Sequence, residues 1–243
     1  MRELAVQIVI PTYNERENIA RLIKGIRAHH PEVGILVVDD ESPDGTAEVV
    51  EAIAARDPRL QVVRRRGPRS FARSLVEGML RALAREPEFV IHMDADLSHS
   101  PHYIADLLRA AEEADLVIGS RYVGGRVNVV NWPLSRLLLS LFANAYVRAI
   151  TRLPVRDATG GFRCWRAEAL RAIDLPSIQS EGYAFQVETL YRAYRLGCRI
   201  VEVPIIFTER NAGASKMNAR IIVESAIRPW TLILGRSVPK SRA

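Results

Sequence analysis

The clearest chemical signal in the sequence is a pair of carboxylates that follows an apolar run. Asp94 and Asp96 flank Ala95 directly after residues 89–93, which read Phe-Val-Ile-His-Met. Side chains two positions apart point to opposite faces of a strand, but in the turn after a strand they can converge on one hard cation. A divalent ion held in this way keeps coordination positions for phosphate oxygens. The alternative is structural, with Asp96 capping the following helix and Asp94 facing solvent.

A second acidic cluster stands at the end of another apolar run, where Val38 leads into Asp39 and Asp40. Carboxylates at a strand end accept hydrogen bonds from the N–H groups of a base and from ribose hydroxyls, which suits a nucleotide. The residues that follow, Ser-Pro-Asp-Gly at 42–45, also form a good turn, with Asp44 as a helix cap. We expect both interpretations to hold: Asp39 or Asp40 serves a ligand, and Asp44 is structural.

The sequence lacks the signatures of several other site classes. It has no Gly-x-Gly-x-x-Gly after the first apolar run and no Gly-Lys-Ser/Thr loop, which argues against dinucleotide and P-loop sites. Cys164 and Cys198 are far apart, so neither a disulfide framework nor a zinc site is expected, and a reducing cytosol fits best. His92 and His99 flank the aspartate pair without a second histidine at ligand spacing, so we expect His92 to be packed or hydrogen-bonded.

Short β-rich runs alternate with segments of helical spacing in the first half of the chain, a pattern typical of a parallel sheet with crossover helices. The predicted strands are 6–10, 34–39, 60–64, 88–93 and 115–119. The predicted helices are 16–29, 44–55, 71–85 and 101–113. The fold class is therefore α/β, a doubly wound and mostly parallel sheet with flanking helices. Ligands of such sheets bind outside the carboxyl ends of the strands, where both acidic clusters stand.

The second half of the chain is expected to elaborate the same domain. The elements predicted there are a helix near 134–151, a bend at Gly-Gly-Phe 160–162, a helix over 183–196, a strand over 199–203 and a final amphipathic helix near 218–235.

The net charge of +6 is confined to the end of the chain. Residues 1–209 hold 27 basic and 27 acidic side chains, whereas residues 210–243 hold seven basic side chains and only Glu224 as an acid. Such an excess favours an anionic partner. Nucleic acid is disfavoured, because the five arginines within residues 64–73 are interleaved with a single aromatic residue, Phe71, and the acidic strand ends would repel a polyanion.

Seven motifs stand in order between residues 10 and 216. They are Ile10-Pro-Thr-Tyr-Asn-Glu15, Val38-Asp-Asp with Ser-Pro-Asp-Gly-Thr46, Asp94-Ala-Asp-Leu-Ser-His99, Gly119-Ser-Arg-Tyr122, Thr159-Gly-Gly-Phe162, Glu181-Gly-Tyr-Ala-Phe-Gln186 and Arg210 to Ser215-Lys216. Together they resemble the polyprenyl (dolichyl) phosphate mannose synthases, which are inverting family-two GT-A glycosyltransferases. The resemblance implies a GT-A fold, GDP-mannose as donor, Mg²⁺ or Mn²⁺ as cofactor and a membrane polyprenyl phosphate as acceptor.

The resemblance also implies roles for individual residues. Those that would line the nucleotide are Pro11, Tyr13, Glu15, Val38 and Asp40. Those that would hold the metal and the diphosphate are Asp94, Ala95 and Asp96, with the two aspartates as the metal ligands. Those that would contact phosphates are Arg121, Arg210 and Lys216. The expected catalytic residues are Asp94, Asp96 and Arg121.

The chemistry of such a transfer suits these residue types. A divalent ion on the diphosphate oxygens stabilises the negative charge of the leaving nucleotide. A polyprenyl phosphate has a second pKa near ~6, so it is already an anionic nucleophile at neutral pH and needs no general base. It needs positioning, and arginine forks match phosphate oxygens, which makes Arg121 and Arg136 candidates to hold it. The alternative for Arg136, on a helix face, is a solvated side chain.

One segment departs from the family pattern. Where relatives carry a Lys and a Gly-Leu-Gly run, residues 64–73 read Arg-Arg-Arg-Gly-Pro-Arg-Ser-Phe-Ala-Arg, and Phe71 with the extra arginines could reshape the sugar or acceptor side. Two alternatives therefore stay open: transfer from UDP-glucose to undecaprenyl phosphate on the same fold, or a catalytically silent subunit that binds a sugar nucleotide. Gln186 or Glu188 is a candidate to bond the sugar hydroxyls.

A membrane acceptor raises the question of how the chain meets a bilayer. No stretch offers the ~20 uninterrupted apolar residues of a spanning helix, and the run at residues 6–10 is too short for a signal peptide. We divide the chain into a GT-A catalytic domain, 1–217, and a C-terminal amphipathic helix with a basic tail, 218–243. That helix has the composition of an interfacial helix at an anionic bilayer, with a core-packed helix as the alternative. The expected location is cytoplasmic, peripheral on the cytoplasmic face of a membrane, and a separate membrane-anchoring subunit is an open alternative.

Overall fold

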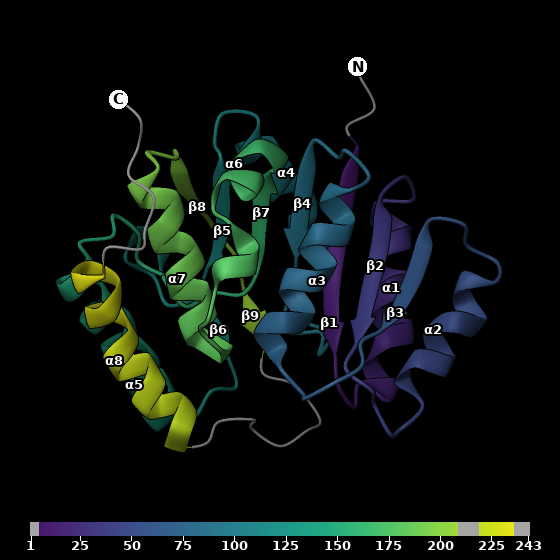
Figure 1. The fold of residues 1–243 in the computed structure, drawn as a ribbon, viewed down its shortest axis with the longest axis horizontal. Coiled ribbons are helices and arrows are strands. Elements are labelled where there is room, and N and C mark those ends of the chain that lie inside the picture. The colour runs from purple at the N-terminus through teal and green to yellow at the C-terminus, as the bar shows by residue number, and fades with distance from the viewer. Residues whose placement is uncertain (1–4, 209–218, 236–243) are drawn as a thin grey trace.

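The computed structural model describes residues 5–208 and 219–235 of the 243-residue chain. Its centre is a seven-stranded sheet in the order β3-β2-β1-β4-β7-β5-β8 (Figure 1). The strands are β1 (Val6–Thr12), β2 (Gly34–Asp39), β3 (Leu60–Arg64), β4 (Phe89–His92), β5 (Leu116–Ser120), β7 (Arg163–Arg166) and β8 (Ile200–Pro204). Neighbours run parallel, except that β7 is antiparallel to β4 and β5. The predicted doubly wound, mostly parallel sheet is confirmed.

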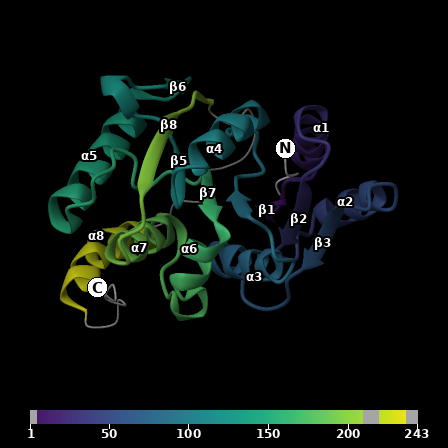
Figure 2. The same ribbon diagram turned by 90° about the horizontal axis from the view of Figure 1, so that it is seen from above.

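Helices cover both faces of this sheet, as Figure 2 shows from above. They are α1 (Arg16–His29), α2 (Thr46–Ala54), α3 (Phe71–Leu83), α4 (Ile104–Ala111), α5 (Leu134–Thr151), α6 (Ala167–Ala172), α7 (Gly182–Arg195) and α8 (Ala219–Leu234). Three single 3-10 turns are η1 (Pro101–Tyr103), η2 (Val123–Gly125) and η3 (Leu175–Ser177). A small parallel ribbon pairs β6 (Val129–Val130) with β9 (Phe207–Thr208).

Two apolar cores lie on opposite faces of the sheet, because side chains alternate along each strand. In β1, Ile8 and Ile10 belong to the core under α1 and α4, whereas Val9 belongs to the core under α3 and α7. Helix α3 lies so close to β1 that a Cβ on Gly78 would stand 2.4 Å from Cγ1 of Val9. The buried face of α1 has helical spacing and consists of Ile19, Leu22, Ile23 and Ile26. This packing fixes the strand ends at which ligands are expected.

Most predicted elements are present, but β7 and α6 were not predicted. The predicted helix over 101–113 is instead the turn η1 followed by α4. In β7, Arg163 is completely buried, and its guanidinium donates to the backbone carbonyls of Ala158, Gly160 and Gln186. These bonds satisfy the buried guanidinium and allow an arginine in a central strand.

The predicted C-terminal helix is present as α8, which packs against α7 and α5. Tyr146 of α5 accepts a hydrogen bond from Nε1 of Trp230 at 2.9 Å and donates one to the backbone carbonyl of Ala226 at 2.8 Å. Arg228 of α8 forms an ion pair of 2.5 Å with Glu188 of α7. The predicted boundary at residue 217 and the basic tail after residue 235 lie outside the described residues, so the two-part division stays a prediction.

Candidate active site

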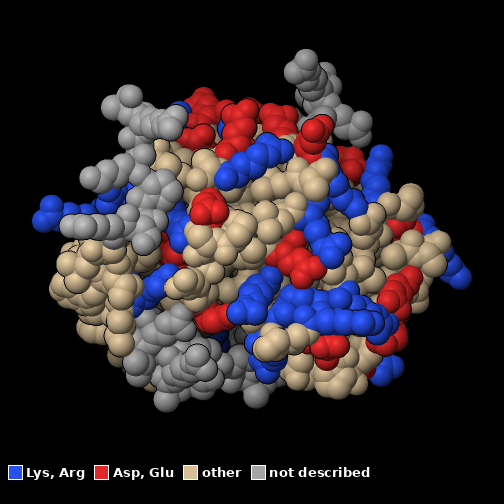
Figure 3. Space-filling model, viewed as in Figure 1, with Lys and Arg blue, Asp and Glu red and all other residues tan. Residues whose placement is uncertain are grey.

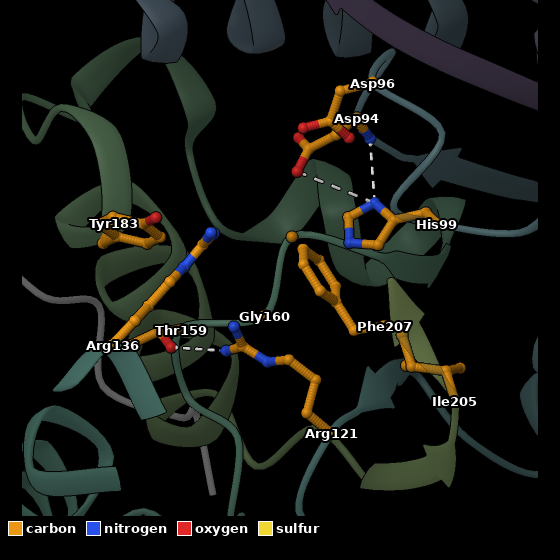
Figure 4. Close-up of a pocket in the computed structure, with 12 residues that line it drawn as sticks. Asp94, Asp96, His99, Arg121, Arg136, Thr159, Gly160, Tyr183, Ile205 and Phe207 are labelled. Atoms are coloured by element: carbon orange, nitrogen blue, oxygen red, sulfur yellow. Dashed lines mark hydrogen bonds and ion pairs between the residues drawn. The ribbon is translucent and has the colours of Figure 1, made fainter. Parts of the chain in front are cut away.

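One pocket collects residues from six parts of the fold at the carboxyl ends of β4 and β5. Its lining comes from the segment after β4, the end of β5, the first turn of α5, the loop before β7, the start of α7 and the segment from β8 to β9 (Figure 4). The lining residues are Asp94, Asp96, His99, Gly119, Arg121, Arg136, Thr159, Gly160, Gly161, Tyr183, Ile205 and Phe207. The structure thus brings together Asp94, Asp96, Arg121 and Arg136, as the sequence predicts.

The two aspartates reach the pocket from one tight turn. Asp94 keeps 36% of its side chain exposed, whereas Asp96 is buried and accepts hydrogen bonds from the backbone N–H of Ser98 at 3.1 Å and from its hydroxyl at 2.5 Å. The capping alternative for Asp96 is wrong, because Ser100 is the cap of the turn η1 that follows. Ala95, between the two aspartates, is buried in the core.

His99 supports this turn through a hydrogen bond to its backbone. Its Nδ1 accepts a hydrogen bond of 3.0 Å from the backbone N–H of Asp94 and lies 3.9 Å from that residue's Oδ2 (Figure 4). Burial lowers the pKa of His99, and this effect outweighs the neighbouring carboxylates, which act in the opposite direction. The neutral ring, stacked on Phe162 at a centroid distance of 5.1 Å, therefore acts as an acceptor that orients the aspartate turn.

Arg121, at the end of β5, is held by a carboxylate that the sequence analysis did not single out. The Nε and Nη2 atoms of Arg121 donate to the two carboxylate oxygens of Asp157 at 2.7 and 2.6 Å, and its backbone N–H donates to the same group at 3.0 Å. Nη2 also donates to the hydroxyl of Thr159 at 2.9 Å. Burial alone would lower the pKa of Arg121, but Asp157 raises it above its usual value, so the guanidinium stays charged. Asp157 therefore fixes the orientation of the Arg121 guanidinium and determines which of its edges points away from the carboxylate.

Arg136 extends from the first turn of α5 into the same pocket, beside Tyr183, and its guanidinium points toward the side of the cavity where Asp94 lies (Figure 4). Its side chain is only partly exposed, and its guanidinium carbon lies 4.4 Å from the ring centroid of Trp132. The alternative of a fully solvated side chain is therefore wrong. Two cations and two acidic side chains share one cavity.

The residues expected to line a nucleotide stand at the adjacent ends of β1 and β2, outside the pocket lining. Pro11 and Val38 are register partners in the two strands, and the side chain of Val38 is buried in the core. Glu15 is buried and accepts a hydrogen bond of 2.9 Å from Asn18. The guanidinium of Arg69 lies 4.0 Å over the ring of Tyr13. The role of these residues toward a nucleotide stays a prediction.

Both carboxylates of the second acidic cluster hold neighbouring segments. Asp39 accepts hydrogen bonds from the hydroxyls of Thr12 at 2.9 Å and Ser42 at 2.6 Å. Asp40 is buried, and its Oδ1 lies 3.0 Å from Nε of Arg65. Its Oδ2 accepts a hydrogen bond of 2.7 Å from the backbone N–H of Ser70. Burial raises the pKa of Asp40, although Ser70 and Arg65 act in the opposite direction.

The structural role expected for Asp44 is confirmed. Its carboxylate accepts from the backbone N–H and the hydroxyl of Thr46 at the start of α2.

The arginine-rich segment is engaged with the protein itself. Arg64 pairs with Glu48 at 3.0 Å and with Glu51 at 2.8 Å, while Arg65 pairs with Asp40. Its contacts join β3 to α2 and to the end of β2. The segment therefore braces the strand ends where the predicted nucleotide residues stand.

Two further expectations concerned His92 and Glu188. His92 is packed as expected: its Nε2 lies 3.2 Å from Oε1 of Gln186, and burial lowers its pKa to about 3, which keeps it neutral. Glu188 was a candidate to bond the sugar, and this is wrong. Its carboxylate is buried between Arg192, at 2.6 Å, and Arg228, where it ties α8 to α7.

Sequence reasoning missed Asp157, Tyr183 and Phe207 as site residues. Asp157 lies in an irregular loop 36 positions after Arg121, so no periodic pattern could have linked the two. Arg210 and Lys216 fall outside the described residues. Across residues 5–208 and 219–235, no group of three or more His, Cys, Asp or Glu side chains is placed to hold a metal ion. In the same ranges no helix combines the length and the apolar character needed to cross a bilayer.

The sequence of this chain is similar to those of known proteins. The family model described as glycosyl transferase family 2 matches residues 7–174. An undecaprenyl-phosphate mannosyltransferase of Micrococcus luteus is 44% identical over 224 residues, which cover 92% of this chain and 92% of that protein. A polyprenol monophosphomannose synthase of Mycolicibacterium smegmatis is 45% identical over 225 residues, 91% of this chain and 84% of that protein.

Solved structures agree at the level of the fold. The crystal structure of glucosyl-3-phosphoglycerate synthase from Mycobacterium tuberculosis, with Mn²⁺, UDP and glucosyl-3-phosphoglycerate, superposes with a TM-score of 0.66. The two sequences are 18% identical, and the match covers 98% of this chain and 82% of that one. This likeness bears on the fold alone, and it confirms the predicted GT-A architecture.

Proposed function

The chain belongs to glycosyl transferase family 2, and on that premise we propose that it transfers mannose from GDP-mannose to a polyprenyl phosphate with inversion. The names and the identity of the two relatives support both the sugar and the lipid acceptor. The observation that carries the proposal is the pocket itself, in which Asp94 and Asp96 share a cavity with Arg121 and Arg136. The aspartates suit a diphosphate bound to a metal ion, and the arginines suit a second phosphate group.

The charges around the pocket support a divalent cation. The lining holds two carboxylates, Asp94 and Asp96, against the two guanidiniums of Arg121 and Arg136, and the buried Asp157 behind Arg121 has Arg163 as a second cationic neighbour. Because these charges balance, the protein alone does not compensate the charge of a diphosphate and a second phosphate, which a bound cation would help to neutralise. Asp94 and Asp96 offer the oxygen ligands that Mg²⁺ and Mn²⁺ prefer, so the residues fit such an ion and would hold it. When bound, it stabilises the charge on the leaving diphosphate.

The rest of the pocket positions the acceptor. Asp157 occupies the Nε and Nη2 edge of Arg121, so the remaining end of the guanidinium fork is turned toward the cavity that Arg136 also enters (Figure 4). The remaining Nη1 group of Arg121 and the guanidinium of Arg136 can both donate to phosphate oxygens, and two such donors fix the place and the orientation of an anionic nucleophile. The acceptor oxygen carries its own charge, so these residues need to align it rather than deprotonate it.

An apolar surface next to the pocket supports a lipid acceptor. Helices α5 and α8 lie side by side, and Figure 3 shows the surface over the upper part of α8, at the left, without charged side chains. The strongly exposed apolar residues of the two helices are Leu134, Leu138, Leu139, Phe142, Ile227, Trp230 and Leu234. Exposed fractions reach 69% at Phe142 and 76% at Leu234. Exposed apolar side chains gathered on two neighbouring helices are typical of peripheral membrane contact.

The same helix joins the two surfaces. Arg136 of α5 enters the pocket, while Leu139, three positions after it and therefore on the same side of the helix, is 50% exposed. A phosphate held at Arg136 therefore has apolar surface within one helical turn for the prenyl chain attached to it. This arrangement supports an acceptor whose head lies in the pocket and whose tail lies along α5, at the surface of a bilayer.

A transfer assay tests the proposed function. Purified protein is incubated with Mn²⁺ or Mg²⁺, a short polyprenyl phosphate and radiolabelled GDP-mannose or UDP-glucose, and the lipid product is extracted and counted. We expect a mannolipid from GDP-mannose, at a rate well above that from UDP-glucose. A glucolipid instead would show that the donor differs on the same fold. Nucleotide binding without any lipid product would identify a silent sugar-nucleotide-binding subunit.

A further inference from the structure

Asn144 is a buried polar residue in the middle of α5, and its side chain reaches the loop before β7. The residue is only 3% exposed. Its amide nitrogen Nδ2 donates to the hydroxyl of Thr159 at 3.2 Å and to the backbone carbonyl of Ser140 at 2.9 Å. Its amide oxygen Oδ1 accepts from the backbone N–H of Thr159 at 3.3 Å. One side chain of α5 therefore holds both the backbone and the hydroxyl of a residue that lines the pocket.

The contacts of the Thr159 hydroxyl define the direction of each hydrogen bond. A hydroxyl has one proton to donate and two lone pairs that accept. Nη2 of Arg121, at 2.9 Å, and Nδ2 of Asn144, at 3.2 Å, are both donors, so they occupy the two lone pairs. The proton is then directed to Oδ1 of Asp157, which lies 3.4 Å away. Asn144 thus completes the hydrogen bonds of the hydroxyl that contacts Arg121 (Figure 4).

The loop at residues 156–160 is held by side chains from three other elements. Glu202 of β8 accepts hydrogen bonds from two backbone N–H groups at the start of the loop, each at 2.8 Å. Arg163 of β7 donates to two of the loop's backbone carbonyls. Asn144 of α5 differs from both, because it also bonds a side chain of the loop, the hydroxyl that contacts Arg121.

The two partners of Arg121 in this loop have different tasks. Asp157 accepts from Nε and Nη2 and supplies the countercharge. The Thr159 hydroxyl accepts from Nη2 as well, without adding a charge. Because a guanidinium is planar, this further acceptor helps to fix the direction in which Nη1 points. A neutral hydroxyl orients Nη1 toward an anion without weakening its electrostatic attraction for that anion.

We propose that Asn144 is a positioning residue for the acceptor phosphate, and that it acts through the hydroxyl of Thr159 on the guanidinium of Arg121. The inference rests on the proposed function for the identity of that phosphate. Asn144 is not one of the residues that line the pocket, so its effect on the acceptor passes through the hydroxyl. The same bonds tie the pocket loop to α5, the helix proposed to carry the prenyl chain. The phosphate site and the surface for the chain thereby keep a fixed relative position.

The test uses variants that remove these hydrogen bonds at nearly constant shape. Asn144→Leu replaces the amide with an apolar group, Thr159→Val removes the hydroxyl, and Thr159→Ser keeps it. Binding of farnesyl phosphate, a soluble prenyl phosphate, is measured by titration calorimetry without donor. We expect its Kd to rise about five- to ten-fold in Asn144→Leu and in Thr159→Val, and less than about two-fold in Thr159→Ser.

Two controls separate positioning from a general loss of structure. The Kd of GDP with Mn²⁺ should change by less than about two-fold in Asn144→Leu. Thr151→Val removes another buried hydroxyl of α5, which bonds the carbonyl of Val147, and it should leave both Kd values unchanged. If Asn144→Leu does not fold, Asn144→Ala, which removes the amide without adding bulk, takes its place with the same expected result.

A double-mutant cycle tests whether Asn144 acts through Thr159. If it does, the variant that combines Asn144→Leu with Thr159→Val should bind farnesyl phosphate no more than about two-fold more weakly than Thr159→Val alone. An unchanged Kd in Asn144→Leu overturns the inference. So does a cycle in which the two effects multiply, or an equal loss of GDP and farnesyl phosphate binding.

Turnover of the same variants separates the positioning role from the proposed reaction. If the wild type transfers no mannose but binds farnesyl phosphate with the expected dependence on Asn144 and Thr159, the positioning role stands and the proposed reaction is wrong. If the wild type transfers mannose and Asn144→Leu has an unchanged acceptor KM, the reaction stands and the positioning role is wrong. If the wild type neither binds farnesyl phosphate nor transfers mannose, both are wrong.

Discussion

The buried pair of Arg121 and Asp157 allows a quantitative prediction. Asp157 is 0% exposed and accepts three hydrogen bonds from Arg121, two of them from its guanidinium. Asp157→Asn keeps the shape and one acceptor oxygen but leaves the cation of Arg121 buried without a countercharge. Breaking a buried pair by removing one partner costs about 3–5 kcal/mol, and the remaining acceptor places this variant near the lower value, about 3 kcal/mol. For a chain of this size that corresponds to a fall in Tm of roughly 10 °C.

The assay is urea unfolding of the wild type, Asp157→Asn, Arg121→Met and the double variant. Because Arg121→Met removes the stranded charge, the double variant should be at least about 2 kcal/mol more stable than the sum of the single losses predicts. The reasoning is refuted if Asp157→Asn loses less than about 1 kcal/mol, or if the two losses simply add.

The pair also sets a pH dependence with a definite sign. Burial alone would raise the pKa of Asp157, but the charge and hydrogen bonds of Arg121 lower it below its usual value of 3.8. A carboxyl whose pKa is lower in the folded state stabilises the fold above the unfolded pKa and loses that contribution as pH falls through the folded value. The stability difference between the wild type and Asp157→Asn should therefore be constant from pH 7 to 5 and shrink below about pH 4. A difference that grows with acidification contradicts the assignment.

Three further predictions concern packing, docking and the membrane face. Gly78→Ala should lose about 1–3 kcal/mol in urea unfolding because its Cβ would clash with β1, whereas the control Gly25→Ala, with 3.4 Å of clearance, should lose nothing. Glu188→Gln should cost about 3 kcal/mol and speed amide exchange in α8, since it leaves a buried arginine unpaired. Phe142→Glu should weaken binding to anionic vesicles at least about ten-fold without loss of stability, and Leu80→Glu, on an exposed part of α3, should not.

The first half of the fold follows closely from the sequence. The predicted ranges 16–29, 34–39 and 60–64 coincide with α1, β2 and β3, because each carries an uninterrupted helical or strand pattern of apolar residues. β7 was missed for a physical reason. Its four residues begin and end with arginine, and the carbonyls that satisfy Arg163 come from segments on both sides of it. No local sequence pattern indicates that a buried arginine is hydrogen-bonded by carbonyl groups of other segments.

The site was predictable to the same extent as the strands that carry it. Asp94, Asp96 and Arg121 follow predicted strands, so the rule that ligands bind at strand ends was enough to select them. Their supports, His99 and Asp157, depend on contacts between loops that only the folded chain brings together. Glu188 shows the converse error, because a polar residue in a promising motif is used to dock a helix.

The same limit applies to the second acidic cluster. Asp39 and Asp40 stand where a nucleotide ligand would be sought, but in the folded chain both carboxylates already bond neighbouring segments. A sequence pattern reports that a carboxylate is available at a strand end, and it does not report the hydrogen bonds that compete for its oxygens.

The central claim, mannose transfer organised by the aspartate pair, is tested most directly by turnover of Asp94→Asn and Asp96→Asn beside the wild type, with GDP-mannose, Mn²⁺ and a short polyprenyl phosphate. We predict that the wild type forms mannosyl lipid and that each variant loses at least about a hundred-fold in turnover while its circular dichroism and Tm stay close to those of the wild type. Turnover close to the wild-type rate in either variant, or no mannosyl lipid from the wild type, would contradict the account.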